Sequence, residues 1–180
     1  MPNLLMLPDG TYGTNNWQCS TGSDFVDIVD EDDDSTYIYE RTRNGVIQYT
    51  MATPSVLEAE IDWNEDVTLQ ARIFAYYTES GGTCDMEIDL IGPLGSSIDI
   101  PSSTVTVADN NTYPPYGGVS TTTMYGIVPW DYDGIGDVIV RLKCIGRPAR
   151  FTELRVSYVN VRMTYTEAAA DNATFFGANF

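Results

Sequence analysis

The stretch from Cys84 to Leu90 reads CDMEIDL and alternates strictly between apolar and acidic residues. Because successive side chains of a β-strand point to opposite faces, this pattern places an apolar row toward a core and an acidic row toward solvent. Two further stretches, 69–77 and 138–144, alternate between apolar and other residues. Three alternations of this length predict an all-β protein.

The segment from Leu154 to Tyr165 also alternates, but its apolar face changes partway along. Leu154, Val156 and Tyr158 share one face, whereas Val159 and the alternate residues after it share the other. A β-bulge between Tyr158 and Val159 would restore the register, and a strand that bends toward a different contact is the alternative. Long bent strands fit two packed sheets better than one flat sheet.

Weaker strand patterns are separated by turn-forming glycine, proline and asparagine residues. They are expected at 25–30, 36–41, 46–52, 57–63, 97–100, 104–107 and 121–128. Together the patterns predict an antiparallel two-sheet sandwich of jelly-roll topology. We expect this domain to span residues 17–166, with short extended arms at 1–16 and 167–180.

The composition excludes histidine-dependent catalysis and makes anionic partners unfavourable. The chain has no histidine, so Ser-His-Asp and Cys-His nucleophile systems cannot be built. It has 26 acidic and 9 basic residues, which give a net charge of -17. A surface this negative repels phosphate backbones and anionic membrane surfaces, so we expect neither a nucleic acid nor a membrane as partner. We also expect no enzymatic activity.

Three cysteines, Cys19, Cys84 and Cys144, show no metal-binding or redox-motif spacing. Their odd number argues against a complete disulfide framework. Cys84 and Cys144 each continue an alternating apolar row, which predicts buried free thiols. The amino-terminal residues do not resemble a secretion signal, so we expect folding in a reducing cytoplasm.

Two acidic loops are candidate calcium sites, although no cofactor is required. Asp131, Asp133 and Asp137 surround a glycine in a spacing that is typical of the start of calcium loops. A hairpin turn with Asp-Gly at its tip explains the same residues and is the preferred interpretation. The second candidate is the acidic run that contains Asp30, Asp32 and Asp34, for which a solvated loop is the preferred alternative.

Exposed tyrosines suggest a possible glycan site. Tyr113, Tyr116 and Tyr125 lie in and next to a Pro/Gly-rich segment, and loops of this kind often carry ligand-binding residues. Tyrosine is also common in strands and at protein–protein contacts, so this pattern does not require a ligand.

Both ends of the chain are apolar. They contribute the candidate interface residues Leu4, Leu5, Leu7, Phe175, Phe176 and Phe180. Free apolar ends are a liability in an acidic protein unless they dock. Docking into the protein's own core and docking onto a neighbouring subunit are both open.

A few segments resemble a loosely defined group of tailed-phage virion proteins. The resemblance rests on Leu7-Pro8-Asp9-Gly10, on Trp17, on the acidic segment that ends in Asp32-Asp33-Asp34-Ser35-Thr36-Tyr37-Ile38, and on the late strand from Leu154 to Tyr165.

The resemblance implies a jelly-roll protein that decorates or cements a capsid shell. Its expected partners are the major capsid protein and its own copies, as a homotrimer or another homo-oligomer on the exterior of the virion. The alternatives are a carbohydrate-binding jelly-roll module on a tail or fibre, and a tail or head-tail connector component.

Overall fold

The structure is a computed structural model of the chain. It describes residues 3–13, 15–21, 25–26, 29, 36–53, 60–62, 65, 68–79, 82–91, 103–108, 119–124, 138–146 and 152–169.

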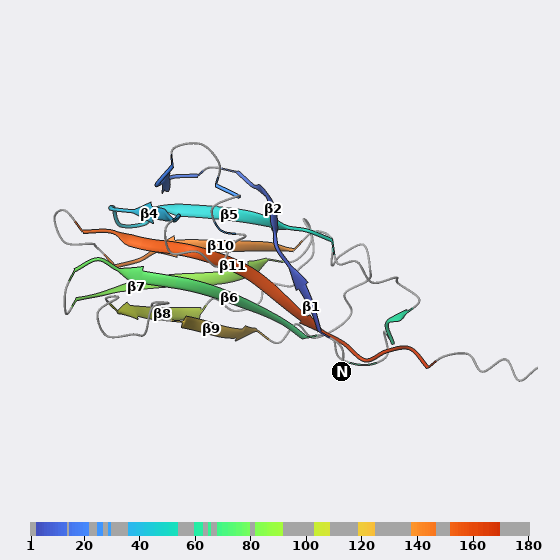
Figure 1. Ribbon diagram of the computed structural model, residues 1–180. Helices are drawn as coiled ribbons and strands as arrows, with labels where there is room; N and C mark the ends of the chain where they lie inside the picture. Colours follow the sequence, from blue (N-terminus) through green and yellow to red (C-terminus); the bar gives the residue numbers. More distant parts are fainter. Residues whose placement is uncertain are drawn as a thin grey trace, which may run out of the picture.

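The described residues form eleven β-strands in two antiparallel sheets and no α-helix, so the all-β prediction is confirmed (Figure 1). Sheet A contains, in spatial order, β3 (Gln18–Cys19), β4 (Ile38–Glu40), β11 (Leu154–Thr164), β6 (Thr68–Tyr77) and β9 (Val119–Met124). Sheet B contains β2 (Pro8–Thr11), β5 (Val46–Met51), β10 (Ile139–Cys144), β7 (Thr83–Ile91) and β8 (Ser103–Ala108). The remaining strand, β1 (Asn3–Met6), pairs with β11.

The inward-facing rows of both sheets form one hydrophobic core. In β7, every second residue of CDMEIDL, beginning with Cys84 and ending with Leu90, is apolar and buried. Asp85 and Glu87, between them, lie half-buried on the outer face. The alternating rows of β6 and β10 are buried in the same way. Period-two alternation therefore identified the core-facing side of three central strands, because each covers the core with one face only.

The face change in the last strand is a β-bulge, as predicted, but it lies slightly earlier than expected. The register of β11 against β6 shifts between Val156 and Tyr158. Before the bulge the core-facing residues are Leu154 and Val156. After it they are Val159, Val161 and Met163. Because Ser157 is the additional residue, Tyr158 points outward and contacts the ring of Phe74 at a centroid distance of 5.2 Å.

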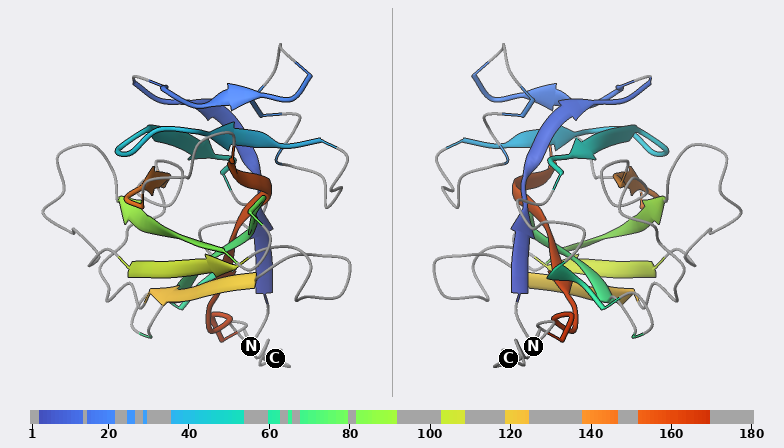
Figure 2. Two further views of the ribbon diagram at one scale, coloured as in Figure 1. Left: turned by 90° about the vertical axis from the view of Figure 1, so that its left-hand side faces the viewer. Right: turned by 90° about the vertical axis from the view of Figure 1, so that its right-hand side faces the viewer.

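The N-terminal segment differs from the expected arm. Strand β1 pairs with β11 in sheet A, and β2 pairs with β5 in sheet B, so the segment joins both sheets (Figure 2). Met6 is buried and Leu4 packs against the core. These pairings satisfy backbone groups that would otherwise be unpaired at the edges of β11 and β5. Residues 3–11 are therefore part of the sandwich.

Other expected elements have mixed outcomes. Strands β4, β5 and β8 occur where 36–41, 46–52 and 104–107 predict them. The predicted strand at 25–30 is wrong for its described residues, which lie in turns. At the C-terminal end, Glu167 forms an isolated bridge with Ile61. Residues 170–180 and 97–100 lie outside the described part of the chain.

Candidate interaction surface

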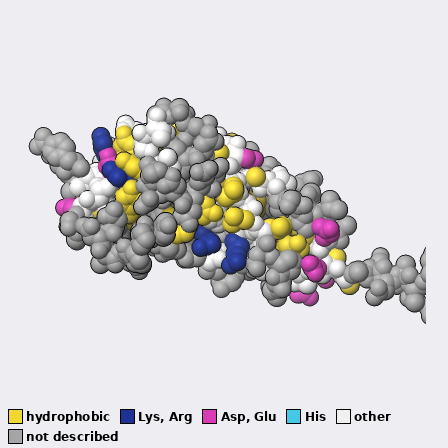
Figure 3. Space-filling model, in the orientation of Figure 1, with side chains coloured by type: hydrophobic (Ala, Val, Ile, Leu, Met, Phe, Trp, Pro, Cys, Tyr) yellow, Lys and Arg dark blue, Asp and Glu magenta, His cyan; other side chains and the backbone are white. Residues whose placement is uncertain are grey.

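The outer face of sheet A carries an unusual set of side chains. It consists of five aromatic residues, Tyr37, Tyr39, Phe74, Tyr76 and Tyr158, and four arginines, Arg41, Arg72, Arg155 and Arg162. We call this surface the Arg–aromatic face. Figure 3 shows hydrophobic side chains over the middle of one side of the molecule, with Lys or Arg side chains next to them and again at one end. Four of the chain's nine basic residues thus lie on one face of one sheet.

Alternation along the strands explains why these residues share a face. Tyr39 in β4 lies opposite Arg155 in β11, and Arg155 lies opposite Tyr76 in β6. Side chains at directly paired positions in an antiparallel sheet lie on the same face and contact one another. One row across three strands therefore holds two tyrosines with an arginine between them.

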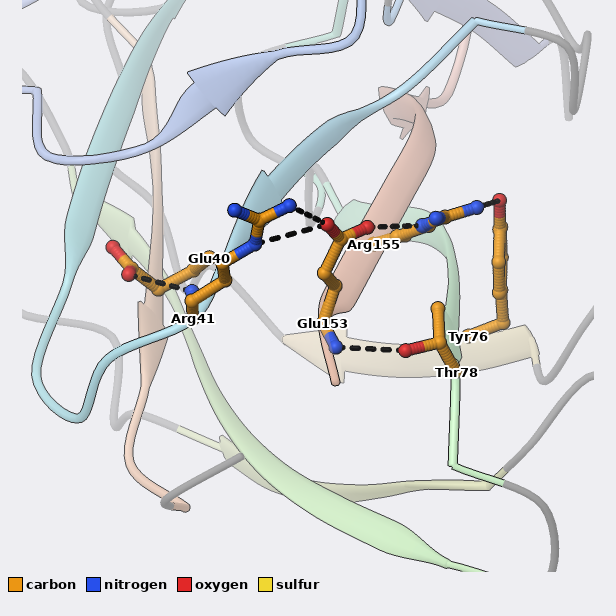
Figure 4. A network of polar contacts seen from close by, with 6 residues as sticks. All are labelled: Glu40, Arg41, Tyr76, Thr78, Glu153 and Arg155. Carbon is orange, nitrogen blue, oxygen red and sulfur yellow. Dashed lines mark hydrogen bonds and ion pairs between the residues drawn. The ribbon is translucent and has the colours of Figure 1, made fainter. Parts of the chain in front are cut away.

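Glu153 connects two of the arginines (Figure 4). Its Oε1 accepts hydrogen bonds from Nε and Nη2 of Arg41, with the Nε bond at 3.0 Å. Its Oε2 accepts a hydrogen bond of 2.7 Å from Nε of Arg155. The Glu153 backbone N–H donates to Oγ1 of Thr78 at 2.7 Å, which ties the residue to the end of β6. The side chain of Glu153 is only 10% exposed, whereas those of Arg155 and Arg41 are 26% and 57% exposed, so the pair with Arg155 is partly shielded and the pair with Arg41 is open to solvent.

The environment of Glu153 favours its charged form. Burial by itself raises the pKa of Glu153, but the hydrogen bonds and charges of Arg41 and Arg155 together outweigh it. The pKa therefore lies below the ordinary value of 4.5. The carboxylate holds both guanidinium groups in place at neutral pH.

The turn after β4 positions Arg41. Oε1 of Glu40 accepts hydrogen bonds from the backbone N–H groups of Arg41 and Thr42, at 2.8 and 2.7 Å. Asn44 adopts a left-handed conformation, with φ of 67°. Gly45 follows, where a Cβ would lie 1.7 Å from Oε2 of Glu40. The turn therefore requires glycine at this position and directs the Arg41 side chain back over the sheet.

Guanidinium groups lie over the tyrosine rings. The Cζ atom of Arg155 is 4.0 Å from the ring centroid of Tyr37 and 5.7 Å from that of Tyr76. Arg41 lies 4.9 Å from the ring centroid of Tyr39. These are cation–π geometries, which hold planar groups rigidly at low entropic cost. The Arg41–Arg155 half of the face is therefore pre-ordered.

The other half of the face holds Arg72 and Arg162. Arg72 lies opposite Asn160 in the strand register, and Arg162 lies opposite both Gln70 and Leu5. Within the described part of the chain neither arginine has a carboxylate partner. Leu5 is 52% exposed, so an apolar side chain lies beside Arg162. Asn160 lies on the same face between them, is completely buried, and has no hydrogen-bond partner for its amide among the described residues, so the exposed side chains of this half are Arg162 and Leu5.

The structure brings together few of the residues that the sequence singled out. Of the N-terminal candidates, Leu4 packs on the core, Leu7 is half-buried and Leu5 remains exposed. The other candidates lie outside the described residues: Asp30, Asp32, Asp34, Asp131, Asp133, Asp137, Tyr113, Tyr116, Tyr125, Phe175, Phe176 and Phe180. The calcium and glycan sites therefore stay predictions. Elsewhere, the described residues contain no group of three or more potential metal ligands.

Sequence reasoning missed the Arg–aromatic face. A signal was present, because Tyr37, Tyr39 and Arg41 alternate, as do Arg72, Phe74 and Tyr76. Each series is short and mixes residue types that also occur singly on surfaces. Only the pairing of β4, β11 and β6 shows that they form one surface.

The comparisons with known proteins identify no relative. No family model, curated protein or solved structure is significantly similar to the chain. Among the described residues, no helix is long and apolar enough to cross a membrane.

Proposed function

We propose that this chain is a structural protein of a virus particle, and specifically a capsid decoration protein that binds the major capsid protein and copies of itself. The observation that carries the proposal is the Arg–aromatic face. Tyrosine and arginine are the residues most enriched at the centres of protein–protein interfaces. A rigid surface of this composition suits adhesion between subunits, which requires contact area and no chemistry.

The strand order supports a jelly-roll topology for the sandwich. The first four of eight consecutive strands pair with the last four in reverse: β4 with β11, β5 with β10, β6 with β9, and β7 with β8. A long double-stranded hairpin that wraps into two sheets has this nested pairing, and jelly rolls have eight strands in two sheets. The proposal that the protein belongs to a virion draws on this topology, which capsid proteins share with lectins.

Charge distribution bears on how copies of the chain would contact one another. Two Arg–aromatic faces placed against each other would bring Arg72 and Arg162 close to like charges. The chain as a whole is strongly acidic, with 26 acidic residues, and among the described residues only Glu153 forms an ion pair with an arginine of this face. A contact between this face and a different, acidic surface is therefore favoured. Contacts of this heterologous type form rings such as trimers when the rotation between subunits closes, and open filaments when it does not.

A carbohydrate-binding module is the second candidate, because aromatic side chains can also stack on sugar rings. The rings of Tyr37 and Tyr39 are covered by guanidinium groups at 4.0 and 4.9 Å. A sugar would have to displace these groups before it could stack. The geometry therefore favours a protein partner over a glycan.

Localisation of the chain tests the proposal most directly. Virus particles would be purified from the cells that naturally produce the chain and labelled with gold-coupled antibodies against it. We expect label on the capsid exterior in electron micrographs. Label at the tail or at the head-tail junction would support a tail or connector component instead. Particles that lack the chain altogether would refute a virion role.

Substitutions then test the surface. Arg162→Glu, which reverses an exposed charge on the Arg–aromatic face, should weaken attachment to shells that lack the protein about tenfold or more. Arg43→Glu is the control, because Arg43 is also exposed but lies in the turn between β4 and β5, where its Nε donates a hydrogen bond to the carbonyl of Ile145. Equal loss from both variants would implicate net charge and not this face. Binding on a glycan array that Tyr116→Ala or Tyr39→Ala abolishes would favour the carbohydrate-binding alternative.

A further inference from the structure

Two buried thiols lie next to each other inside the sandwich. The Sγ atoms of Cys84 and Cys144 are 3.7 Å apart, and both residues are free cysteines. Cys84 begins the inward row of β7, and Cys144 ends the inward row of β10. The third cysteine, Cys19, lies in β3 of the other sheet and provides an internal comparison.

The strand register explains the contact. Cys144 lies opposite Met86, so Cys84 occupies the diagonal inward position on the neighbouring strand. Gly146 leaves space beside it, because a Cβ there would lie 2.9 Å from Sγ of Cys84. Formation of a bond of about 2.05 Å requires the sulfurs to approach by about 1.7 Å. Because diagonal positions lie farther apart than directly opposite ones, the adjacent ends of β7 and β10 must also shift toward each other as the side chains rotate.

We propose that Cys84 and Cys144 form an oxidisable dithiol, which a peroxide converts to an intrachain disulfide once the protein leaves a reducing compartment. This inference does not depend on the proposed function, because it rests only on the contact between the two sulfurs.

The reaction balances with one peroxide per disulfide. The Cys84 thiolate attacks one oxygen of hydrogen peroxide, the O–O bond breaks, and hydroxide leaves with the proton that Cys84 gave up, as water. Cys84 is then a sulfenic acid. The sulfur of Cys144 attacks the sulfur of Cys84, the S–O bond breaks, and the departing hydroxide takes the Cys144 proton as a second water. The two thiols together lose two electrons, and the peroxide gains them as it is reduced to water.

Cys84 is the first thiol to react. It is 4% exposed, whereas Cys144 is completely buried, and a peroxide is small enough to reach a sulfur near the end of a sheet. The two sulfurs share a hydrogen-bond contact in which either thiol can donate, and this contact with Cys144 lowers the pKa of Cys84. The thiolate is the nucleophile in this chemistry, so the same contact that positions the resolving thiol also activates the attacking one.

The bond would stabilise the sandwich. It would join β7 and β10, which are already hydrogen-bonded neighbours, and close the chain segment between residues 84 and 144 into a loop. A cross-link of this length restricts the unfolded chain strongly, so the melting temperature of the oxidised protein should rise by several degrees.

Peptide mapping provides the test. The full chain would be treated with hydrogen peroxide under native conditions, alkylated in denaturant and digested. Intact mass alone is insufficient, because the six methionines also oxidise. We expect a peptide pair joined through Cys84 and Cys144, with Cys19 alkylated, and we expect dithiothreitol to reverse the link. Cys19→Ser should retain the link, whereas Cys84→Ser and Cys144→Ser should lose it.

Three results would overturn the inference. They are complete alkylation of both thiols after oxidation, accumulation of a Cys84 sulfinic acid without a cross-link, and cross-links that involve Cys19. Because the mapping is decisive for the unaltered chain, the inference remains testable even if a cysteine variant does not fold.

Discussion

The two outer faces of the sandwich are built on the same alternating backbone but carry different chemistry. On β5, β7, β8 and β10 of sheet B, no outward side chain among the described residues is aromatic. The two cations there each pair with a carboxylate on the neighbouring strand: Arg141 with Asp89, and Lys143 with Glu87 at 3.4 Å. On sheet A, guanidinium groups lie over aromatic rings, and two arginines have no carboxylate partner in the described part of the chain.

The pKa of a buried carboxylate depends on the balance between its burial and the cations around it, and the two sheets differ in this balance. Glu153 on sheet A has two arginines, and its pKa is lowered. Asp89 on sheet B is 5% exposed, and its burial outweighs the single Arg141, so its pKa is raised. Oδ1 of Asp89 has no hydrogen-bond partner in the described structure. Glu153 therefore orders a surface of sheet A, whereas Asp89 is incompletely satisfied, as is the buried Oε2 of Glu40 in sheet A.

Glu153→Gln should have the largest effect on stability. We expect the free energy of unfolding at pH 7 to fall by about 2 kcal/mol, mainly because the charged hydrogen bond from Arg155 to the largely buried carboxylate is weakened; the bond from the exposed Arg41 adds little. The lowered pKa means that the carboxylate stabilises the fold above pH 4.5 and loses this contribution as the pH falls through the folded-state pKa. Urea denaturation at several pH values should therefore show the variant and the unaltered chain converging in acid. A constant difference would contradict the assignment.

Removal of the stacked ring should have a smaller effect. Tyr37→Leu removes the ring that lies under Arg155 and should cost about 1 kcal/mol. Tyr37→Phe keeps the ring and is the matched control, with little expected change. Thermal unfolding of both variants would measure the difference. If phenylalanine costs as much as leucine, the hydroxyl group and not the ring is responsible.

Asp89→Asn should change stability by less than about 1 kcal/mol at pH 7, because loss of the ion pair is offset by relief of the buried charge. Its pH dependence should be opposite to that of Glu153→Gln. The raised pKa means that protonated Asp89 is favoured in the folded state, so the unaltered chain gains stability relative to the variant as the pH falls toward 3.8. If the variant instead becomes more stable relative to the unaltered chain as the pH falls, the attraction of Arg141 outweighs the burial of Asp89.

The Lys143–Glu87 pair should have the smallest effect. A double-mutant cycle with alanine at both positions should give a coupling energy below about 0.5 kcal/mol, because both side chains are partly exposed and the separation is 3.4 Å. The coupling should decrease further in 0.5 M salt, where charges at surfaces are screened over only a few ångströms, about 4 Å. A coupling as large as that of Glu153 with Arg155 would remove the contrast between the two faces.

The sequence determined the all-β class, the core rows of β6, β7 and β10 and the buried thiols. It also located a change of apolar face in β11 but left open whether a bulge or a bend causes it. These features follow from the alternation of apolar and polar residues with a period of two. This alternation can be read within a single strand and is clear wherever one face of the strand is buried. The same reasoning did not identify β1 and β2, because short edge strands have too few residues to show alternation. The sequence also predicted an extended arm at residues 1–16, whereas β1 and β2 pair with both sheets.

Tertiary structure alone decided which residues meet. Tyr37, Tyr76 and Arg155 come from three segments far apart in the chain, and Cys84 and Cys144 meet across two strands. A pattern with period two states which face a side chain occupies but not which strand lies beside it. Strand pairing is nonlocal, because it is selected by how the two sheets close over a shared core. The Arg–aromatic face and the thiol pair exist only after that choice has been made.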